Sequence, residues 1–301
     1  MYKPLVLVTG ATGFIGSHLL PFLLKKDYRV VALTRQKNKI SNHPNLTWIE
    51  SLNDLKTDKI DYVINLAGES IGKGRWTAHR KQQIINSRVD TTESLYRYLA
   101  KRNIVPTRII SGSAVGYYGI DNSERWLETC TEESAPQDIF MSELCQKWEA
   151  VTENYPNQNT KTIRLGVVLG KGGGILPQVL LPIKLNIIGK IGSGLQPFVW
   201  IHILDVLNAI EFLMLNETEL KIFNLVAPEK VNQKAFVQVS SLILKRKPIF
   251  SMPRFLMQLA LGEQSQLVLN GQYVKPKTLQ DLGFQFQYPT LREALNNLIV
   301  D

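Results

Sequence analysis

The chain is poor in the side chains that bind metals and form disulfides. It has only two cysteines among 301 residues, Cys130 and Cys145. Two isolated thiols suit a reducing compartment and cannot complete a metal site alone. The four histidines stand at no spacing typical of metal ligands; they are His18, His43, His79 and His202. We therefore expect no bound metal.

Long apolar segments are missing as well. A membrane-spanning helix needs about 18 or more consecutive apolar residues, and no such run appears. The most apolar region, residues 174–192, is interrupted by two prolines and two lysines. No basic segment followed by an apolar one precedes the first strand-like run, so the sequence gives no sign of a signal peptide. We expect no membrane partner and a cytoplasmic protein.

The positive charge does not form the pattern of a nucleic-acid-binding surface. The formal net charge is +9, but the basic residues are scattered along the chain. A binding surface for DNA or RNA would need a basic stripe or patch. Some of this charge suits a pocket for an anionic cofactor, and we expect no nucleic-acid partner.

Apolar runs typical of strands alternate with helical patterns up to about residue 215. Continuously apolar runs are typical of parallel strands buried on both faces by crossover helices. The expected strands are residues 3–10, 28–35, 46–50, 61–68, 108–113 and 161–170. The expected helices are near residues 14–26, 77–103 and 140–155. This order predicts an α/β fold with a doubly wound parallel sheet of the Rossmann type.

The character of the sequence changes after about residue 215. Residues 226–246 read as a turn followed by a helix capped by Asn232, and four prolines divide the rest into short pieces. We therefore expect a Rossmann domain over residues 1–215. Residues 216–301 should form a smaller, mainly helical C-terminal region that lies on the substrate side and partly interleaves with the main domain.

The segment "TGATGFIG" has the spacing of a dinucleotide-binding turn. Gly10 permits a tight exit from the first strand, Gly13 a close approach of the pyrophosphate, and Gly16 close packing of helix on strand. The following helix begins near Phe14 and directs free N–H groups at the phosphates. Because the motif follows a strand and opens a helix, it predicts nucleotide binding.

The end of the second strand distinguishes between cofactors. An acidic residue there would bind the ribose hydroxyls of NAD. The chain has Thr34 and Arg35 instead, followed by Gln36, Lys37 and Lys39. A guanidinium can form paired hydrogen bonds with a 2′-phosphate and stack on adenine. We therefore expect NADP(H).

Together these segments resemble the extended or atypical short-chain dehydrogenases/reductases. The resemblance is strongest to the epimerase family, which has a nucleotide-sugar-epimerase-like architecture and a C-terminal domain of unknown function. It runs through "VTGATGFIG", "INLAGESI", "SRVDTT" and "RLGVVLGKGGGIL", and through the more specific "WIHILD" and "GQYVKP".

The resemblance implies a set of cofactor contacts along the chain. The glycine turn would contribute Gly10, Thr12, Gly13, Phe14, Ile15 and Gly16, and the second strand Thr34 and Arg35. Leu66, Ala67 and Gly68, at the end of the fourth strand, would line the adenosine and pyrophosphate side. The long helix after that strand would contribute Gln83 and Arg88, and Val167 would lie near the nicotinamide.

The usual catalytic pair of this superfamily is absent. Members normally carry a Tyr and a Lys at Y-x-x-x-K spacing, with a Ser after the fifth strand, and the tyrosine exchanges a proton with the substrate. Ser113 matches the serine. Phe140 and Leu144 occupy the expected Tyr and Lys positions, and neither can carry a proton.

Several residues are candidates to replace the missing acid. Ser113 is expected to orient the substrate as a hydrogen-bond donor, and Tyr117 or Tyr118 lies close by in sequence. His202 and Asp205 could form a polar pair on the substrate side, and Glu69 is a further acid. For each of these a structural role is the alternative. Tyr273 and Lys277 also have Y-x-x-x-K spacing, but the intervening proline disfavours a regular helix, so we discount them.

Two classes of function follow from these residues. The first is an NADP(H)-dependent oxidoreductase or epimerase-like enzyme acting on a small polar substrate that the sequence does not identify. The second is a non-enzymatic NADP(H)-binding regulator or partner protein, with a hint of cell division in the names of some relatives. The residues leave the oligomeric state open, and the resemblance implies that a homodimer would pair through helices such as 77–103 and 140–155.

Overall fold

The computed structural model describes residues 2–35 and 42–300. Its centre is a seven-stranded sheet in the order β11-β7-β5-β4-β1-β2-β3, in which every neighbouring pair is parallel. The strands are β1 (Leu5–Thr9), β2 (Arg29–Leu33), β3 (Leu46–Ile49), β4 (Tyr62–Asn65), β5 (Arg108–Ala114), β7 (Thr160–Leu165) and β11 (Ile222–Leu225). The predicted doubly wound parallel sheet is confirmed.

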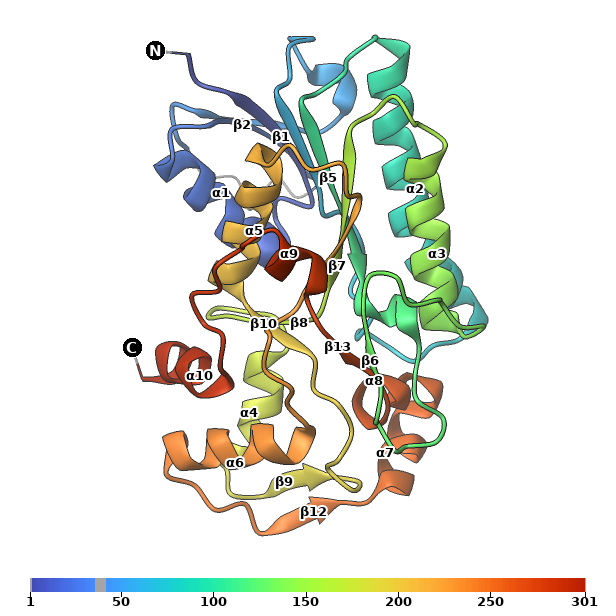
Figure 1. Cartoon of the computed structure of the whole chain (residues 1–301), viewed down its shortest axis with the longest axis vertical. Helices are drawn as coiled ribbons and strands as arrows, with labels where there is room; N and C mark the ends of the chain where they lie inside the picture. Colours follow the sequence, from blue (N-terminus) through green and yellow to red (C-terminus); the bar gives the residue numbers. More distant parts are fainter. Residues whose placement is uncertain (1, 36–41, 301) are drawn as a thin grey trace.

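Helices cover both faces of this sheet. One face carries α1 (Phe14–Lys25) and α5 (Ile203–Leu215), and the opposite face carries α2 (Ala78–Lys101) and α3 (Phe140–Glu153) (Figure 1). The helices predicted near 14–26, 77–103 and 140–155 therefore form within two residues of the expected ends. Parallel strands need such crossovers, and the helices bury the apolar strands from both sides.

The alternation of side chains in β1 divides the core in two. Val6 and Val8 pack into the cluster formed with α1 and α5, whereas Leu5 and Leu7 pack against α2. All four side chains are buried, because successive residues of a strand point to opposite faces and both faces are covered. The apolar strand sequence "LVLVT" reflects this double burial.

The predicted strand 161–170 is divided into two strands that belong to different sheets. After β7 the chain bends at Gly166, and β8 (Val167–Leu169) pairs with β10 (Trp200–His202) instead of extending the main sheet. A Cβ at Gly166 would lie 3.0 Å from the carbonyl oxygen of Val199 and from a methyl of Val226. The glycine therefore allows the close approach at which the chain changes sheets.

A smaller and mainly helical region follows the main sheet, as predicted. Asn232 caps its longest helix, with its Oδ1 accepting a hydrogen bond from the backbone N–H of Ala235 at 2.8 Å. Its helices are α4 (Leu176–Lys184), α6 (Gln233–Leu244), α7 (Arg254–Leu261), α8 (Gln266–Leu269), α9 (Lys277–Asp281) and α10 (Leu291–Ile299). Short parallel pairs join β9 (Ile188–Ile191) to β12 (Phe250–Met252) and β6 (Thr129–Cys130) to β13 (Tyr273–Val274).

The two regions also contain short 3₁₀ turns. They lie at Leu52–Asp54 and Val115–Tyr118 in the main domain and at Gly262–Ser265 in the C-terminal region.

The two regions interleave across the boundary expected at residue 215. Strand β11 lies beyond that residue, yet it pairs with β7 at the edge of the main sheet. Helix α4 lies before it, yet it packs against α6 of the C-terminal region (Figure 1). The boundary itself stays a sequence-based prediction.

The parallel arrangement brings the carboxyl ends of the strands to one edge of the sheet. Loops that follow β1, β4, β5 and β7 meet there, and Thr34 and Arg35 follow β2 at the same edge, which is where open α/β sheets bind ligands. Among the described residues, no helix is both long and apolar enough to cross a membrane.

Candidate functional site

The glycine turn after β1 is held in place by contacts that exclude side chains. Gly10 has a φ of +69°, and a Cβ there would lie 2.5 Å from the carbonyl oxygen of Leu66. A Cβ at Gly16 would lie 2.3 Å from the carbonyl oxygen of Gly10. The structure therefore confirms the two conformational expectations, a tight exit at Gly10 and close packing at Gly16. Gly13 is the N-terminal cap of α1, with no side chain to satisfy the first N–H groups of the helix.

A cavity of about 640 Å³ opens beside this turn. Thr12, Gly13 and Phe14 line it together with Gly172 and Gly173 from the loop after β8. Free N–H groups and the positive end of the helix dipole at the start of α1 favour an anion at this end of the cavity. Ile15, in the same first turn, is half-buried and packs against the core on the α1 face.

The end of β2 presents the residues expected to select the cofactor. Thr34 is buried, and its N–H donates to the carbonyl oxygen of Ile49 at 3.0 Å. Arg35 is exposed at the edge of the sheet, where its guanidinium is accessible to a ligand. Gln36, Lys37 and Lys39 lie outside the described residues.

The three residues expected to line the cofactor after β4 lie beside the glycine turn. Leu66 and Ala67 are half-buried, and Gly68 is exposed. A Cβ at Gly68 would lie 3.1 Å from the guanidinium carbon of Arg88, so the absence of a side chain allows Arg88 to lie across the strand end. Arg88 donates to the carbonyl oxygens of Glu69 at 2.9 Å and of Ile84 at 3.2 Å.

Arg88 is a partly buried cation. Burial lowers the pKa of its guanidinium. The guanidinium lies over the ring of Trp148, with Cζ 5.3 Å from the ring centre. Gln83, one turn earlier on α2, is exposed, and its amide nitrogen lies 3.0 Å from Nε2 of His79. Val167 is half-buried at the start of β8. The residues expected around the cofactor thus come from several elements to one edge of the sheet.

Ser113 is the first member of a buried polar network. Its Oγ donates to Oε1 of Glu149 at 2.5 Å, and only 2% of Ser113 and 7% of Glu149 are exposed. Arg164 binds the same carboxylate twice, through Nε at 2.9 Å and Nη2 at 2.7 Å. A carboxylate paired in this way accepts hydrogen bonds and does not donate them. The hydroxyl proton of Ser113 is therefore committed to Glu149, and the oxygen keeps only acceptor capacity, which differs from the donor role expected from the sequence.

The face of α3 that meets Ser113 differs from the one inferred from spacing. Cys145 and Glu149, one turn apart, point towards β5, and Sγ of Cys145 lies 3.5 Å from the carbonyl oxygen of Ala114. Phe140 and Leu144 pack away from it, in the apolar cluster around Trp76. The facing positions thus carry a thiol and a carboxylate. Burial raises the pKa of the Cys145 thiol to about 11, so the thiol stays protonated and unreactive near neutral pH.

The two tyrosines after Ser113 have different environments. Tyr118 is buried, and its hydroxyl donates to Oδ1 of Asn224 at 2.7 Å and accepts from Nη1 of Arg164 at 3.0 Å. Burial raises the pKa of Tyr118 to about 12, which makes it part of the structural network. Tyr117 is half-buried, and the guanidinium of Arg164 lies 3.4 Å from the centre of its ring. Of the two phenols, Tyr117 is the more accessible to a ligand.

His202 and Asp205 do not form the expected polar pair. Nδ1 of His202 accepts from the N–H of Leu204 at 3.1 Å and caps α5, while Nε2 lies 3.2 Å from Oδ1 of Asn297. Asp205 accepts from two backbone N–H groups of the C-terminal segment, those of residues 287 and 288, at 2.7 and 3.0 Å. Both side chains are buried, so the geometry supports structural roles and no catalytic role for His202.

The remaining candidates for an acid are occupied as well. Oε2 of Glu69 lies 2.5 Å from Nη1 of Arg80, and this hydrogen bond lowers the pKa of Glu69, which makes it a carboxylate at neutral pH. Tyr273 lies in β13, whereas Lys277 begins α9 and pairs with Asp281. Their spacing is therefore a coincidence.

Glu149 and Arg164 are the site residues that sequence reasoning missed. A signal existed for Arg164, because a charged residue inside the apolar run "KTIRLGVVLG" has to find a buried partner. The sequence alone does not show which residue is this partner, because Glu149 lies on a helix and is 15 residues earlier in the chain. Within the described parts of the chain, no three His, Cys, Asp or Glu side chains gather in a way that could hold a metal ion.

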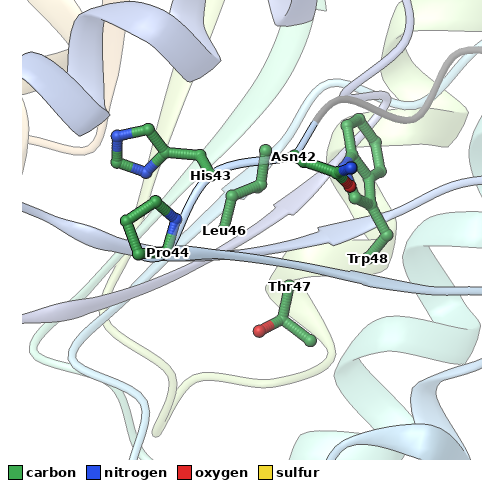
Figure 2. Close-up of a pocket in the computed structure, with 6 residues that line it drawn as sticks. All are labelled: Asn42, His43, Pro44, Leu46, Thr47 and Trp48. Atoms are coloured by element: carbon green, nitrogen blue, oxygen red, sulfur yellow. The ribbon is translucent and has the colours of Figure 1, made fainter.

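A second pocket shares Trp48 with the cavity beside the glycine turn. It has a volume of about 530 Å³ and is lined by Asn42, His43, Pro44, Leu46, Thr47 and Trp48 (Figure 2). Its residues belong to β3 and the segment before it, at the far edge of the sheet. None of the expected site residues lines it.

Comparison with known proteins places the chain among epimerase-like proteins. A model of the NAD dependent epimerase/dehydratase family matches residues 6–226, and one of a domain of unknown function, DUF1731, matches residues 252–298. An epimerase family protein of Staphylococcus aureus (strain MRSA252) is 37% identical over 299 residues, which cover 97% of this chain and 98% of that protein.

Solved structures agree with this assignment. The human epimerase family protein SDR39U1 (isoform2), crystallised with NADPH, is 30% identical over 99% of both chains, with a TM-score of 0.89. A nucleoside-diphosphate sugar epimerase from Corynebacterium glutamicum is 28% identical, with a TM-score of 0.77 over 99% of this chain and 58% of that one. The resemblance inferred from the sequence is thus confirmed, and the chain belongs to the NAD dependent epimerase/dehydratase family.

Proposed function

We propose that this protein binds NADP(H) and uses it as an atypical short-chain dehydrogenase/reductase-like enzyme, either an oxidoreductase or an epimerase-like protein, on a small polar substrate. The family membership and the glycine turn support a dinucleotide. The human relative, whose structure contains NADPH, supports the phosphorylated form.

The observation that carries the proposal is Arg35 at the end of β2. An NAD-specific site would place a carboxylate at this point to bind the ribose hydroxyls. Arg35 is exposed at the strand end instead, and an arginine fork matches the geometry of a phosphate.

The chain offers a backbone surface into which a dinucleotide fits. Gly10 and Gly16 exclude side chains from the turn, and Gly13 leaves the first N–H groups of α1 available to a diphosphate. NADP(H), when bound, supplies or accepts a hydride at its nicotinamide ring. Val167 would then border the nicotinamide half, and Arg88 would reach the cofactor from its place across Gly68.

Turnover tests the enzymatic part of this proposal. We expect purified protein to oxidise NADPH, or to reduce NADP⁺, with at least one member of broad carbonyl, alcohol and sugar-nucleotide panels, followed at 340 nm. Tyr117→Phe should lower that rate, because its phenol is the more accessible of the two, whereas Tyr98→Phe, near the C-terminal end of α2 where its hydroxyl accepts a hydrogen bond from Arg102, should not.

A second function, a non-enzymatic NADP(H)-binding regulator or partner protein, is favoured by the state of the catalytic positions. Ser113 and Glu149 satisfy each other inside the core, and Cys145 stays protonated. Tight NADPH binding without turnover on any panel would support this alternative and contradict the enzymatic one. The homodimer and the cytoplasmic address stay predictions; light scattering in solution tests the first, and fractionation of cells the second.

A further inference from the structure

Three more charged side chains gather on the adenosine side of the proposed cofactor site. Glu69 follows Gly68 directly at the end of β4, and Arg80 lies in the first turn of α2. Lys73 is exposed in the loop that joins them. None of the three is needed for the glycine turn or for the buried network around Ser113.

An ion pair fixes the position of Arg80. Its Nη1 lies 2.5 Å from Oε2 of Glu69 and 3.3 Å from Oε1 of Gln83, and Nη2 donates to the carbonyl oxygen of Ser70 at 3.0 Å. The side chain of Arg80 is 17% exposed and that of Glu69 is 41% exposed. In the described part of the chain, Nε of Arg80 is buried without a hydrogen-bond partner. The pair is therefore anchored at the strand end and open to solvent on the side of the carboxylate.

The sheet topology places this pair near Arg35. Only β1 separates β2 from β4, so their carboxyl ends lie about 10 Å apart at the same edge. The hydrogen bond from Arg80 lowers the pKa of Glu69 most, and the charges of Arg35 and Lys73 lower it further.

We propose that Arg80 and Lys73 act together with Arg35 to select the 2′-phosphate of NADP(H), while Glu69 limits that selectivity. The inference rests on the proposed function, in which Arg35 meets this phosphate. It assigns a specificity-determining role to residues that lie on another strand end and on α2.

The charge balance explains the direction of each effect. Three cations and one carboxylate surround this corner, so the local potential favours a phosphate over a neutral hydroxyl. Arg80 compensates the charge of Glu69. Without Arg80 the carboxylate would repel the phosphate, and without Glu69 the cations would attract it more strongly.

The ratio of the dissociation constants of NADH and NADPH, measured by calorimetry at low salt, tests the proposal. We expect Lys73→Gln to lower this ratio by about threefold, the usual effect of an exposed charge. Arg80→Gln should lower it by about tenfold, because it also leaves Glu69 uncompensated. Glu69→Gln should raise it by about threefold. The double variant Glu69→Gln/Arg80→Gln should return close to the wild-type ratio.

Arg97→Gln is the matched control. Arg97 lies on the same helix, more than four turns from Arg80, and pairs with Glu93 on the surface, so its loss should leave the ratio unchanged. All changes should appear in the affinity for NADPH, with the affinity for NADH nearly constant.

Two results would overturn the inference while leaving the proposed function intact. One is an unchanged ratio in both Lys73→Gln and Arg80→Gln. The other is an equal loss of NADH and NADPH affinity, which would indicate a structural role of the ion pair. Lys73 lies on an exposed loop, so Lys73→Gln still tests the inference if Arg80→Gln fails to fold. If wild-type protein binds neither dinucleotide, the proposed function fails, and the inference fails with it.

Discussion

At the scale of single residues, Glu149 and Arg164 form the buried ion pair at the centre of the polar network around Ser113. Both side chains are more than nine-tenths buried and bind through two hydrogen bonds. Glu149→Ala should therefore lower the free energy of unfolding by about 3–5 kcal/mol, because it leaves a buried guanidinium without its partner. Urea unfolding measures this loss.

Apolar replacement of the whole pair is the control. In Glu149→Leu/Arg164→Met neither charge is left alone, so the double variant should be more stable than Glu149→Ala. A double variant as unstable as the sum of the single changes would contradict the view that the unpaired charge is the main cost.

The glycine turn allows a comparison between two neighbouring glycines. Gly16→Ala should lower the free energy of unfolding by about 1–3 kcal/mol, because its Cβ would lie 2.3 Å from a backbone oxygen that cannot move aside. Gly13→Ala meets its nearest atom at 3.1 Å and should cost much less. Thermal unfolding of the two variants measures these losses of stability. Equal losses would mean that α1 moves away from the turn without a cost in free energy.

Not all of these residue-scale features could be predicted from the sequence. The glycine turn was readable, because its motif is local and its spacing maps directly onto a strand, a turn and a helix. The network around Ser113 was not, because it depends on which face of α3 meets β5. A shift of one residue along a helix turns a side chain by about 100°, which separates Leu144 from Cys145.

At the scale of elements, the cap of α5 makes stability depend on pH. Burial lowers the pKa of His202 to about 4, against about 6.5 in an unfolded chain. The folded state holds the neutral ring, so its contribution is fully present above pH 6.5 and is lost as the pH falls towards 4. We expect the free energy of unfolding to fall by up to about 3 kcal/mol over this range.

The variant His202→Asn separates this effect from general acid denaturation. Asparagine can still cap the helix but carries no titrating group in this range. Urea unfolding between pH 7 and pH 4.5 should give a flatter dependence for His202→Asn than for the wild type, and His79→Asn should not differ from the wild type. A wild-type slope retained in His202→Asn would contradict the assignment.

Helix α7 is held mainly by its ends. None of its residues is buried, whereas α5 buries eight. Arg75 donates to the carbonyl oxygens of Leu259 and Ala260 at 3.0 and 2.9 Å, and Arg254 pairs with Glu124. Amide hydrogens of α7 should therefore exchange by local opening much faster than those of α5.

The variant Arg75→Ala tests what holds α7. It should accelerate exchange in α7 and leave α5 unchanged, as measured by mass spectrometry of deuterated peptides. Protection of α7 equal to that of α5 would show that burial or assembly stabilises the helix instead.

At the scale of the whole molecule, the fold followed from the sequence more closely than the site. Continuous apolar runs separated by helical patterns are sufficient to predict a parallel sheet, because strands that helices bury on both faces are apolar throughout. The change of sheet at Gly166 and the return of β11 to the main sheet depend on contacts between distant segments. The division at residue 215 shows this limit, because strands and helices cross it in both directions.

The central claim, that the protein binds NADP(H) through Arg35, is tested most directly by calorimetric titration with NADPH, NADH, NADP⁺ and NAD⁺. We predict that the phosphorylated dinucleotides bind more tightly. Arg35→Ala should weaken their binding by about 1.5–3 kcal/mol and leave the others nearly unchanged, as expected for a charged hydrogen bond. Equal affinity for NADH and NADPH, or no binding of any dinucleotide, would contradict the account.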